Sequence, residues 1–249
     1  MRISPAVHYS IGGLWCDYEG AAGGMIKVGS PRNHQTNVPG LFAGGEVDYQ
    51  YHGANRLGAN SLLSCVYAGI VGGPAMIAHA QGLKATVGEA GGNGDAAAAV
   101  KKWEARLEGI AALDGPENPY ALHRELSEVM NENVTVVRFN DKLKATDDKI
   151  RETMERWRRI NVLDASGWTN QPLLFANQFW NMLELARVIT VGAIARDESR
   201  GSHYKPESPE RNDEEWLKTT IATWTPDGPK LTYEPVDVSL VKPVARKYD

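Results

Sequence analysis

The stretch HGANRLGANSLLS, from His52 to Ser64, places a histidine, an arginine, two asparagines and two serines within thirteen positions. The guanidinium of Arg56 is a planar donor that suits a carboxylate, and His52 and Asn55 add directional hydrogen-bonding groups. The glycines that precede the apolar run let a ligand approach the backbone. This pattern is typical of a site for a small anion, but from spacing alone a polar loop that caps the following helix fits equally well.

Two further residues are candidates for the same site, namely His8 in HYSIGG and Glu46 after FAGG. A lone histidine is most often a packed or surface residue, and an acid at the end of a strand often caps a backbone amide. Neither residue therefore identifies a site by itself, and the contexts of His34, His79 and His123 indicate no role. The sequence has no dinucleotide-binding glycine motif, Walker loop, nucleophile elbow or metal-ligand spacing, so no metal is expected.

The elements that must position these residues are a strand, a glycine turn and a helix. VPGLFAGGE predicts a short strand over 41–43 that leads to Glu46. NSLLSCVYAGIVGGPAMIAHA predicts a helix with Asn60 or Ser61 as its N-cap and with small residues that allow close packing. Because the start of a helix exposes unpaired N–H groups and partial positive charge, we expect it to face the ligand of the polar stretch.

Residues 98–199 read as a helical region. VKKWEARLEGIAAL, PYALHRELSEVMNENV and TDDKIRETMERWRRINVL each carry apolar residues at helical spacing, and Thr146 of the third is a predicted cap. NQPLLFANQFWNMLELARVITVGAIA is strongly apolar and predicts the central buried helix of a small bundle. The glycine-rich residues 89–97 predict a linker, and DGPKLTYEPVDVSL near the end predicts a hairpin or an extended arm.

Composition excludes several classes of protein. The formal net charge of −4 and the absence of a basic patch argue against a nucleic-acid partner. Cys16 and Cys65 form no CxxC pair, which favours free thiols in a reducing compartment. No run approaches 18 uninterrupted apolar residues, so no transmembrane helix is expected, and the first residues lack the layout of a signal peptide.

Three motifs together go beyond what spacing explains: HYSIGGLWCDY, TNVPGLFAGGEVDYQYHGANRLGANSLLSCVYAGIVGG and ARDESRGSHYKPESPERNDEEWLK. They resemble the C-terminal part of the flavoprotein subunit of succinate dehydrogenase and fumarate reductase, most closely the bacterial branch with a diheme membrane anchor. The resemblance implies an α+β fold. It comprises a C-terminal piece of a Rossmann-like FAD-binding domain over 1–88, the linker 89–97, a three-helix bundle domain over 98–199 and an extended C-terminal tail subdomain over 200–249.

The same resemblance implies roles for particular residues. His8 and Arg56 match residues that hold the carboxylates of succinate or fumarate, while Glu46, Ser61 and Leu62 match residues that contact FAD. No catalytic residue is assigned within the chain. The proton donor and the histidine that bonds covalently to FAD are expected in an N-terminal flavoprotein segment that this sequence lacks.

The implied activity is the oxidation of succinate to fumarate, with electrons passed through FAD to an iron–sulfur subunit. A membrane-anchor cytochrome b subunit is a further implied partner, and the implied location is cytoplasmic, peripheral on the inner face of the cell membrane. ESRGSH, residues 198–203, is expected to be structural with an interface role. Two alternatives stay open: a truncated, non-catalytic fragment or assembly partner, and a related flavoprotein such as L-aspartate oxidase, against which Ser64 argues.

Overall fold

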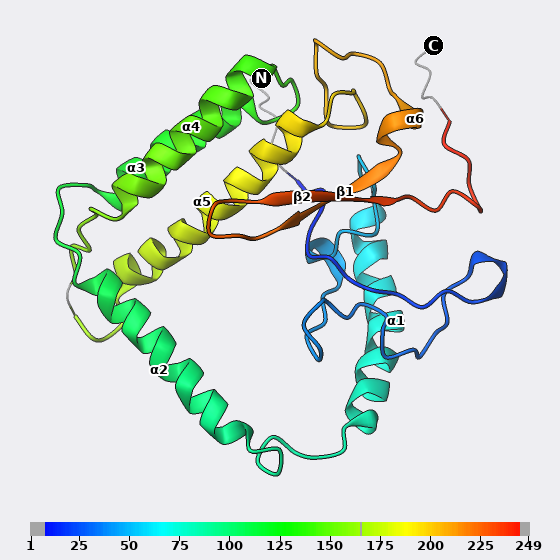
Figure 1. Cartoon of the computed structure of the whole chain (residues 1–249), viewed down its shortest axis with the longest axis horizontal. Helices are drawn as coiled ribbons and strands as arrows, with labels where there is room; N and C mark the ends of the chain where they lie inside the picture. The colour runs from blue at the N-terminus through cyan, green and yellow to red at the C-terminus, as the bar shows by residue number, and fades with distance from the viewer. Residues whose placement is uncertain (1–7, 165, 245–249) are drawn as a thin grey trace. The chain divides into compact units, whose positions relative to one another are not determined.

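The computed structural model describes residues 8–164 and 166–244, and most of its regular structure is helical (Figure 1). Five long helices, three short helical turns and one two-stranded sheet make up the described chain, which is an α+β arrangement. In chain order the elements are η1 (Ala22–Gly24), η2 (Gly45–Val47), α1 (Asn60–Gly82), α2 (Gly92–Ala111), α3 (Pro119–Asn133), α4 (Asn140–Trp157), α5 (Gln171–Ala195), α6 (Asp213–Trp216), β1 (Lys218–Thr223) and β2 (Lys230–Pro235).

The described residues divide into two compact units. Residues 8–86 and 235–244 belong to the first unit, which contains η1, η2 and α1. Residues 87–234 belong to the second unit, which contains the other helices and nearly all of the hairpin. This division differs from the expected one, because residues 200–234 group with the helices and the last described residues group with the first unit.

The core of the second unit forms around α5, as the sequence predicts. Phe179 and Leu183 of this helix are completely buried. α4 packs against both α3 and α5, and α2 packs against α5, so four helices rather than three surround this core. Its buried apolar side chains are Ile110, Leu122, Leu126, Ile150, Ile160, Val162, Ala176, Phe179, Leu183 and Ala186.

The helix ends follow from local chemistry, with one correction. The Asn118 side chain accepts hydrogen bonds from two backbone N–H groups of the first turn of α3, and Pro119 occupies the first helical position. α4 begins at Asn140, six residues before the predicted cap. The prediction of Thr146 as a cap is wrong: its hydroxyl donates to the Lys142 carbonyl at 2.8 Å, inside the helix.

The segment expected to be a linker is largely helical. α2 begins at Gly92, so it includes most of residues 89–97. The alanine run after residue 95 explains the difference, because alanine has the highest intrinsic helix propensity. Of the apolar face predicted for this helix, Ile110 is buried, whereas Val100, Trp103 and Leu107 are exposed.

The ARDESRGSH segment of the second unit holds a buried carboxylate. Glu198 is fully buried and accepts charge-assisted hydrogen bonds from Arg196 at 2.6 Å and from Arg200 at 2.7 Å. Arg200 also contacts Asp213 at the start of α6. Despite its burial, the pKa of the Glu198 carboxyl is lowered, because these guanidinium groups and the Asn212 N–H stabilise the charged form. The segment is therefore structural, as expected, while its interface role stays a prediction.

Two more polar groups are buried next to this carboxylate. His203 Nδ1 lies 2.7 Å from Arg138 Nη1, and His203 Nε2 lies 3.1 Å from the carbonyl oxygen of Arg196. Burial, and the nearby charge of Arg138, lower the pKa of His203 to about 4. Lys205 is completely buried and donates to the Ile194 carbonyl at 3.0 Å and to Asp197 at 2.8 Å.

In the first unit, α1 begins without a side-chain cap. Its N-cap residue is Ala59, in the left-handed region at φ 66°, so neither Asn60 nor Ser61 caps the helix as predicted. By length and composition α1 is apolar enough to cross a membrane, a property that the search for uninterrupted apolar runs missed. The expected strand over 41–43 is reduced to one bridge between Phe42 and Gln35.

Candidate functional site

Residues 10–14 lie beside residues 46–47, although more than thirty residues separate the two segments in the sequence. Gly13 has no room for a side chain, because a Cβ there would lie 2.2 Å from the Val47 carbonyl oxygen. Leu14 N–H donates to that carbonyl at 2.7 Å. The Ser10 N–H donates to the Glu46 carboxylate at 2.8 Å. The HYSIGG segment is therefore fixed against the turn η2 that carries Glu46.

Tyr9 connects the HYS motif to the polar stretch before α1. Its ring meets the His52 ring edge to face, with centroids 4.9 Å apart. Its hydroxyl lies 3.5 Å from Ser64 Oγ, and His52 Nε2 lies 3.3 Å from the same oxygen. Ser64 Oγ itself donates to the Ser61 carbonyl at 2.7 Å, so it is left to accept from the other two groups. The first turn of α1 is thereby tied to the HYS motif.

Arg56 also contacts the Tyr9 ring. Its guanidinium carbon stands 5.1 Å from the centroid of the Tyr9 ring, and Nη1 donates to the Leu57 carbonyl at 3.2 Å. Its Nε is buried and has no hydrogen-bond partner within residues 8–164 and 166–244. A buried, charged donor without a partner is costly, so a carboxylate that accepts from this nitrogen fits the site.

The start of α1 and the Glu46 side chain offer groups that suit a flavin. No side chain caps the first turn, which contains Ser61 and Leu62, so its backbone N–H groups are available to an electron-rich ring edge. Glu46 is exposed beyond its bond to the Ser10 N–H and can accept from hydroxyl groups. These residues of the chain therefore fit FAD.

The predicted site residues are brought together to different degrees. Arg56, Glu46 and Ser61 are linked through the segment 9–10 and through Ser64. His8 is exposed and directly precedes Tyr9, and its approach to a shared ligand with Arg56 stays a prediction. Sequence reasoning missed the bridging function of Tyr9 and Ser64, although both lie within the motifs that carry the resemblance.

A buried histidine–carboxylate pair, also missed, connects His34 to the segment that carries Glu46 and Arg56. His34 Nδ1 stands 2.8 Å from Asp48 Oδ2, and both side chains are almost completely buried. The same nitrogen lies 3.2 Å from the Ala43 carbonyl and 3.2 Å from the Tyr51 hydroxyl. His34 adopts a left-handed backbone at φ 62°, uncommon for a residue other than glycine. The pair fixes the middle of the site segment.

Burial of Asp48 also affects two neighbours. The pKa of the Cys16 thiol rises to about 12, because the thiol is desolvated and faces the Asp48 charge. Desolvation and the same charge raise the pKa of the Tyr51 hydroxyl. Both groups are therefore neutral and protonated at neutral pH, so Cys16 lacks the thiolate that a reactive cysteine needs.

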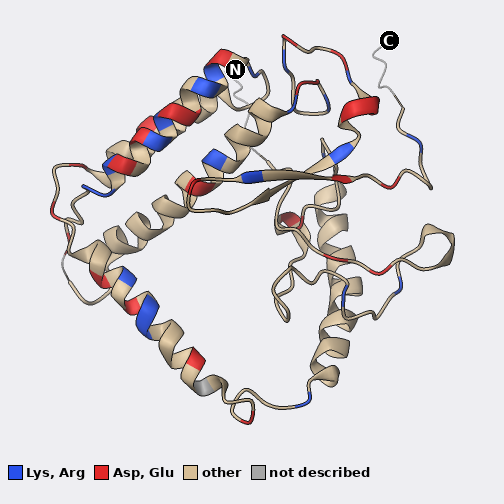
Figure 2. Cartoon of the chain, viewed as in Figure 1, with Lys and Arg blue, Asp and Glu red and all other residues tan. Residues whose placement is uncertain are grey.

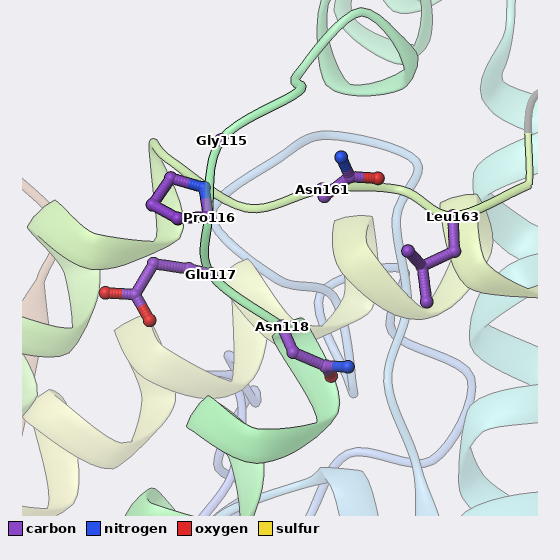
Figure 3. Close-up of a pocket in the computed structure, with 6 residues that line it drawn as sticks. All are labelled: Gly115, Pro116, Glu117, Asn118, Asn161 and Leu163. Carbon is purple, nitrogen blue, oxygen red and sulfur yellow. The ribbon is translucent and has the colours of Figure 1, made fainter.

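The second unit has a hollow of about 270 Å³, but it does not have the features of a reaction site (Figure 3). Glu117 and Asn118 point in different directions there, and Glu117 is engaged by Arg156 at 2.9 Å. Asn118 is engaged in capping α3. The remaining lining residues are Gly115, Pro116, Asn161 and Leu163. Few polar groups are left to converge on a ligand in this hollow.

Comparison with protein-family models gives two matches. The model described as fumarate reductase flavoprotein C-term matches residues 123–248. The model described as an FAD binding domain matches residues 1–62, which include the HYS motif, η2 and the first residues of α1.

Curated relatives align along nearly the whole chain. The succinate dehydrogenase flavoprotein subunit of Bacillus subtilis (strain 168) is 53% identical over 250 residues, which cover 100% of this chain and 40% of that protein. The fumarate reductase flavoprotein subunit of Escherichia coli (strain K12) is 33% identical over 253 residues, which cover 99% and 38%. The chain thus spans about two-fifths of the length of these relatives.

Solved structures agree with the sequence relatives. A variant of the E. coli quinol fumarate reductase superposes with a TM-score of 0.76 at 33% identity, covering 85% of this chain and 36% of that chain. The Mycobacterium smegmatis Sdh1 complex gives a TM-score of 0.68 at 26% identity, covering 87% and 36%.

Proposed function

Because the chain belongs to the family of succinate dehydrogenase and fumarate reductase flavoprotein subunits, we propose that it forms the dicarboxylate-binding part of such a subunit. The reaction is the oxidation of succinate to fumarate, with electrons passed through FAD. The observation that carries this proposal is the buried Nε of Arg56, which has no partner among the described residues and faces the HYS motif.

The assembly proposed around the chain follows from the same family. Residues 1–88 contribute to a Rossmann-like FAD-binding domain, whose other part supplies the proton donor and the covalent attachment of FAD. The electron acceptor is an iron–sulfur subunit, and a cytochrome b subunit anchors the complex. The location is cytoplasmic, peripheral on the inner face of the membrane. Support comes from relatives that are named as flavoprotein subunits, of which the chain covers two-fifths.

The chain's own contribution to the reaction is orientation of the substrate. The guanidinium of Arg56 neutralises one carboxylate of the substrate, and its buried Nε thereby gains a hydrogen-bond acceptor. His8 binds the other carboxylate. Tyr9, held by Ser64 and His52, limits how far the guanidinium can move. Fixing both ends of a short diacid fixes the carbon atoms between them, which can lower the barrier by several kcal/mol.

The residues that would hold FAD are Glu46, Ser61 and Leu62. FAD, when bound, supplies a two-electron acceptor for the hydride that leaves succinate. Glu46 would accept from flavin hydroxyl groups, and the backbone of Ser61 and Leu62 would meet the pyrimidine edge of the ring. The positive end of α1 would stabilise the negative charge that the reduced flavin carries at this edge, so it would raise the reduction potential of the flavin.

The proposal is tested in a chimeric subunit in which this chain replaces the aligned region of the B. subtilis flavoprotein. Arg56→Lys removes the planar pair of donors but keeps the charge, so we expect kcat/KM for succinate to fall roughly 10- to 100-fold with flavin retained. Arg158→Lys, at an exposed position of the second unit, is the matched control. Unchanged succinate oxidation in the Arg56 variant would exclude the carboxylate-binding function.

A further inference from the structure

Arg56 keeps a charged donor in an unfavourable place. Its Nε is buried, and no acceptor for it lies among the residues that the structure describes. Because a buried, unpaired charged donor is costly, this side chain would gain by turning towards water. Its guanidinium carbon lies 5.1 Å from the centroid of the Tyr9 ring, and Nη1 donates to the Leu57 carbonyl at 3.2 Å. The position of Arg56 therefore depends on what holds Tyr9.

A row of rings leads from Tyr9 to the buried His34. The ring centroids of Tyr9 and His52 are 4.9 Å apart, and those of His52 and Tyr51 are 6.1 Å apart. The Tyr51 ring in turn lies 5.9 Å from the His34 ring. These separations are typical of aromatic side chains in contact, so the ring row of Tyr9, His52, Tyr51 and His34 is continuous.

α1 supports the ring row without adding charge to it. Ser64 Oγ lies within 3.5 Å of polar atoms of Tyr9 and His52. About one turn further along the helix, the Tyr67 ring lies 6.0 Å from the Tyr51 ring. The helix carries no Lys, Arg, Asp or Glu (Figure 2), so it offers no counter-charge beside the row. Electrostatic restraint of the row must therefore come from another part of the first unit.

His34 provides that restraint through one ring nitrogen. Its Nδ1 lies 2.8 Å from Asp48 Oδ2 and 3.2 Å from the Ala43 carbonyl oxygen. Because a carboxylate and a carbonyl only accept hydrogen bonds, the geometry assigns a proton to Nδ1 and leaves Nε2 to the Tyr51 hydroxyl at 3.4 Å. The Asp48 side chain is fully buried, so it cannot exchange this donor for water. The end of the ring row is thereby fixed.

We propose that His34 is a positioning residue for dicarboxylate binding. Its Nδ1–H, paired with Asp48, fixes Tyr51, and the ring row then holds Arg56 with its Nε free for the ligand. An arginine that already has its bound conformation loses less freedom when the ligand arrives, so it binds more tightly. This inference rests on the proposed function, in which Arg56 binds a carboxylate, and it gives His34 no contact with the substrate.

The left-handed backbone of His34, at φ 62°, decides which substitutions are informative. Asparagine tolerates this conformation, and its side-chain amide can place a donor where Nδ1–H stands, so His34→Asn is the conservative variant. His34→Ala removes the donor. Tyr51→Leu interrupts the ring row but keeps the buried pair, so it tests the proposal even if His34→Ala does not fold. His79→Asn, at a half-buried histidine of the same unit, is the matched control.

The first measurement needs no ligand. Solvent exchange of the Arg56 Nε–H is followed by NMR in the 249-residue chain, isotope-labelled at its arginine side chains, and Arg56→Lys identifies the signal. We expect the exchange rate to rise roughly fivefold or more in His34→Ala and Tyr51→Leu, because the side chain opens more often. His34→Asn and His79→Asn should change it less than about twofold. Circular dichroism checks that each variant keeps its helices.

The second measurement is the affinity of the chimeric subunit for malonate, a dicarboxylate without the two adjacent methylene groups that oxidation requires. Calorimetry normalised to bound flavin should give binding roughly tenfold weaker in His34→Ala and within about twofold of the unmodified subunit in His34→Asn. In an Arg56→Lys background, His34→Ala should weaken binding by less than about threefold, because its effect passes through Arg56. A merely structural loss would reduce the amount of loaded protein and leave its affinity unchanged.

The contrary outcomes have defined meanings. An Arg56 exchange rate that His34→Ala and Tyr51→Leu leave unchanged would overturn the proposal. So would equal losses of malonate affinity in His34→Ala and His34→Asn, or fully additive effects of His34→Ala and Arg56→Lys. Faster Arg56 exchange in His34→Ala, in a protein that binds no malonate, would support the positioning of Arg56 while refuting the proposed function.

Discussion

Arg56 and Asp48 stand eight residues apart in one segment and have opposite electrostatic requirements. Arg56 has a buried nitrogen without a partner in the described chain, whereas the buried carboxylate of Asp48 is paired with His34. The first is a group that a ligand can satisfy, and the second is a group that folding has already satisfied. Because both residues belong to this segment, we propose that the buried pair helps to position Arg56.

The buried pair of His34 and Asp48 should contribute to the stability of the first unit. Asp48→Asn removes the negative charge while keeping the shape, so His34 loses its charge-assisted partner. Breaking one member of a buried pair should lower the free energy of unfolding of the first unit by about 1–3 kcal/mol. Urea unfolding measured by Tyr and Trp fluorescence tests this. Asp148→Asn, at an exposed position, should change little, and equal effects of the two substitutions would argue against the pair.

The buried His203 should make the stability of the second unit depend on pH. Its pKa is lowered to about 4 by burial and by Arg138, whereas a histidine in the unfolded chain has its ordinary pKa of 6.5. Between these values the unfolded state binds more protons, so stability falls as the pH falls from 6.5 towards 4, by up to about 1.4 kcal/mol per pH unit. His203→Gln should flatten this dependence in thermal melts between about pH 7 and pH 4.5. A slope that the substitution leaves unchanged would assign the effect to other groups.

At the scale of elements, α5 is the helix on which the second unit depends. Phe179→Ala would leave a cavity among α3, α4 and α5 and should cost roughly 3–5 kcal/mol. Trp103→Ala on α2 removes a larger side chain, but one that is 56% exposed, so it should cost far less. Chemical denaturation of both variants provides the measurement, and a smaller loss for Phe179→Ala than for Trp103→Ala would contradict the assigned core.

The long helices were predictable because their sequences carry enough periodic signal. α3 has a proline at its first position, a capping asparagine and two buried leucines, and these agree with one another. The start of α2 was missed because glycines near residue 92 resemble a linker, while the alanines that follow favour helix. The strand over 41–43 was overpredicted, since its apolar residues make only one bridge.

The site could be predicted only in part. Arg56 and Glu46 stand in motifs that resemble a known family, and their residue types indicate the chemistry. The His34–Asp48 pair carries no comparable signal, because the partners are fourteen residues apart in the sequence and meet only through a left-handed backbone at His34. Pairs of this kind depend on tertiary folding, which local patterns do not encode.

At the scale of the whole molecule, the two units have unequal cores. Both apolar clusters of the described chain consist of residues between 110 and 194, all in the second unit. The first unit buries few large apolar side chains, and several large apolar side chains of α1, such as Leu62 and Ile70, are more than half exposed. We therefore expect backbone amides of α1 to exchange with deuterium faster than those of α5 in the isolated chain. Mass spectrometry of peptides from both helices tests this, and equal protection would contradict it.

Lys205, which is completely buried within the second unit, can serve as a chemical marker of whether that unit is folded. Its amine is enclosed and occupied by the Ile194 carbonyl and Asp197. An acylating reagent needs a free, deprotonated amine, so it should modify surface lysines at once and spare this one until the surrounding chain opens. The rate at which a single lysine becomes acylated would then record the opening of the unit directly, without an attached dye or any knowledge of its ligands.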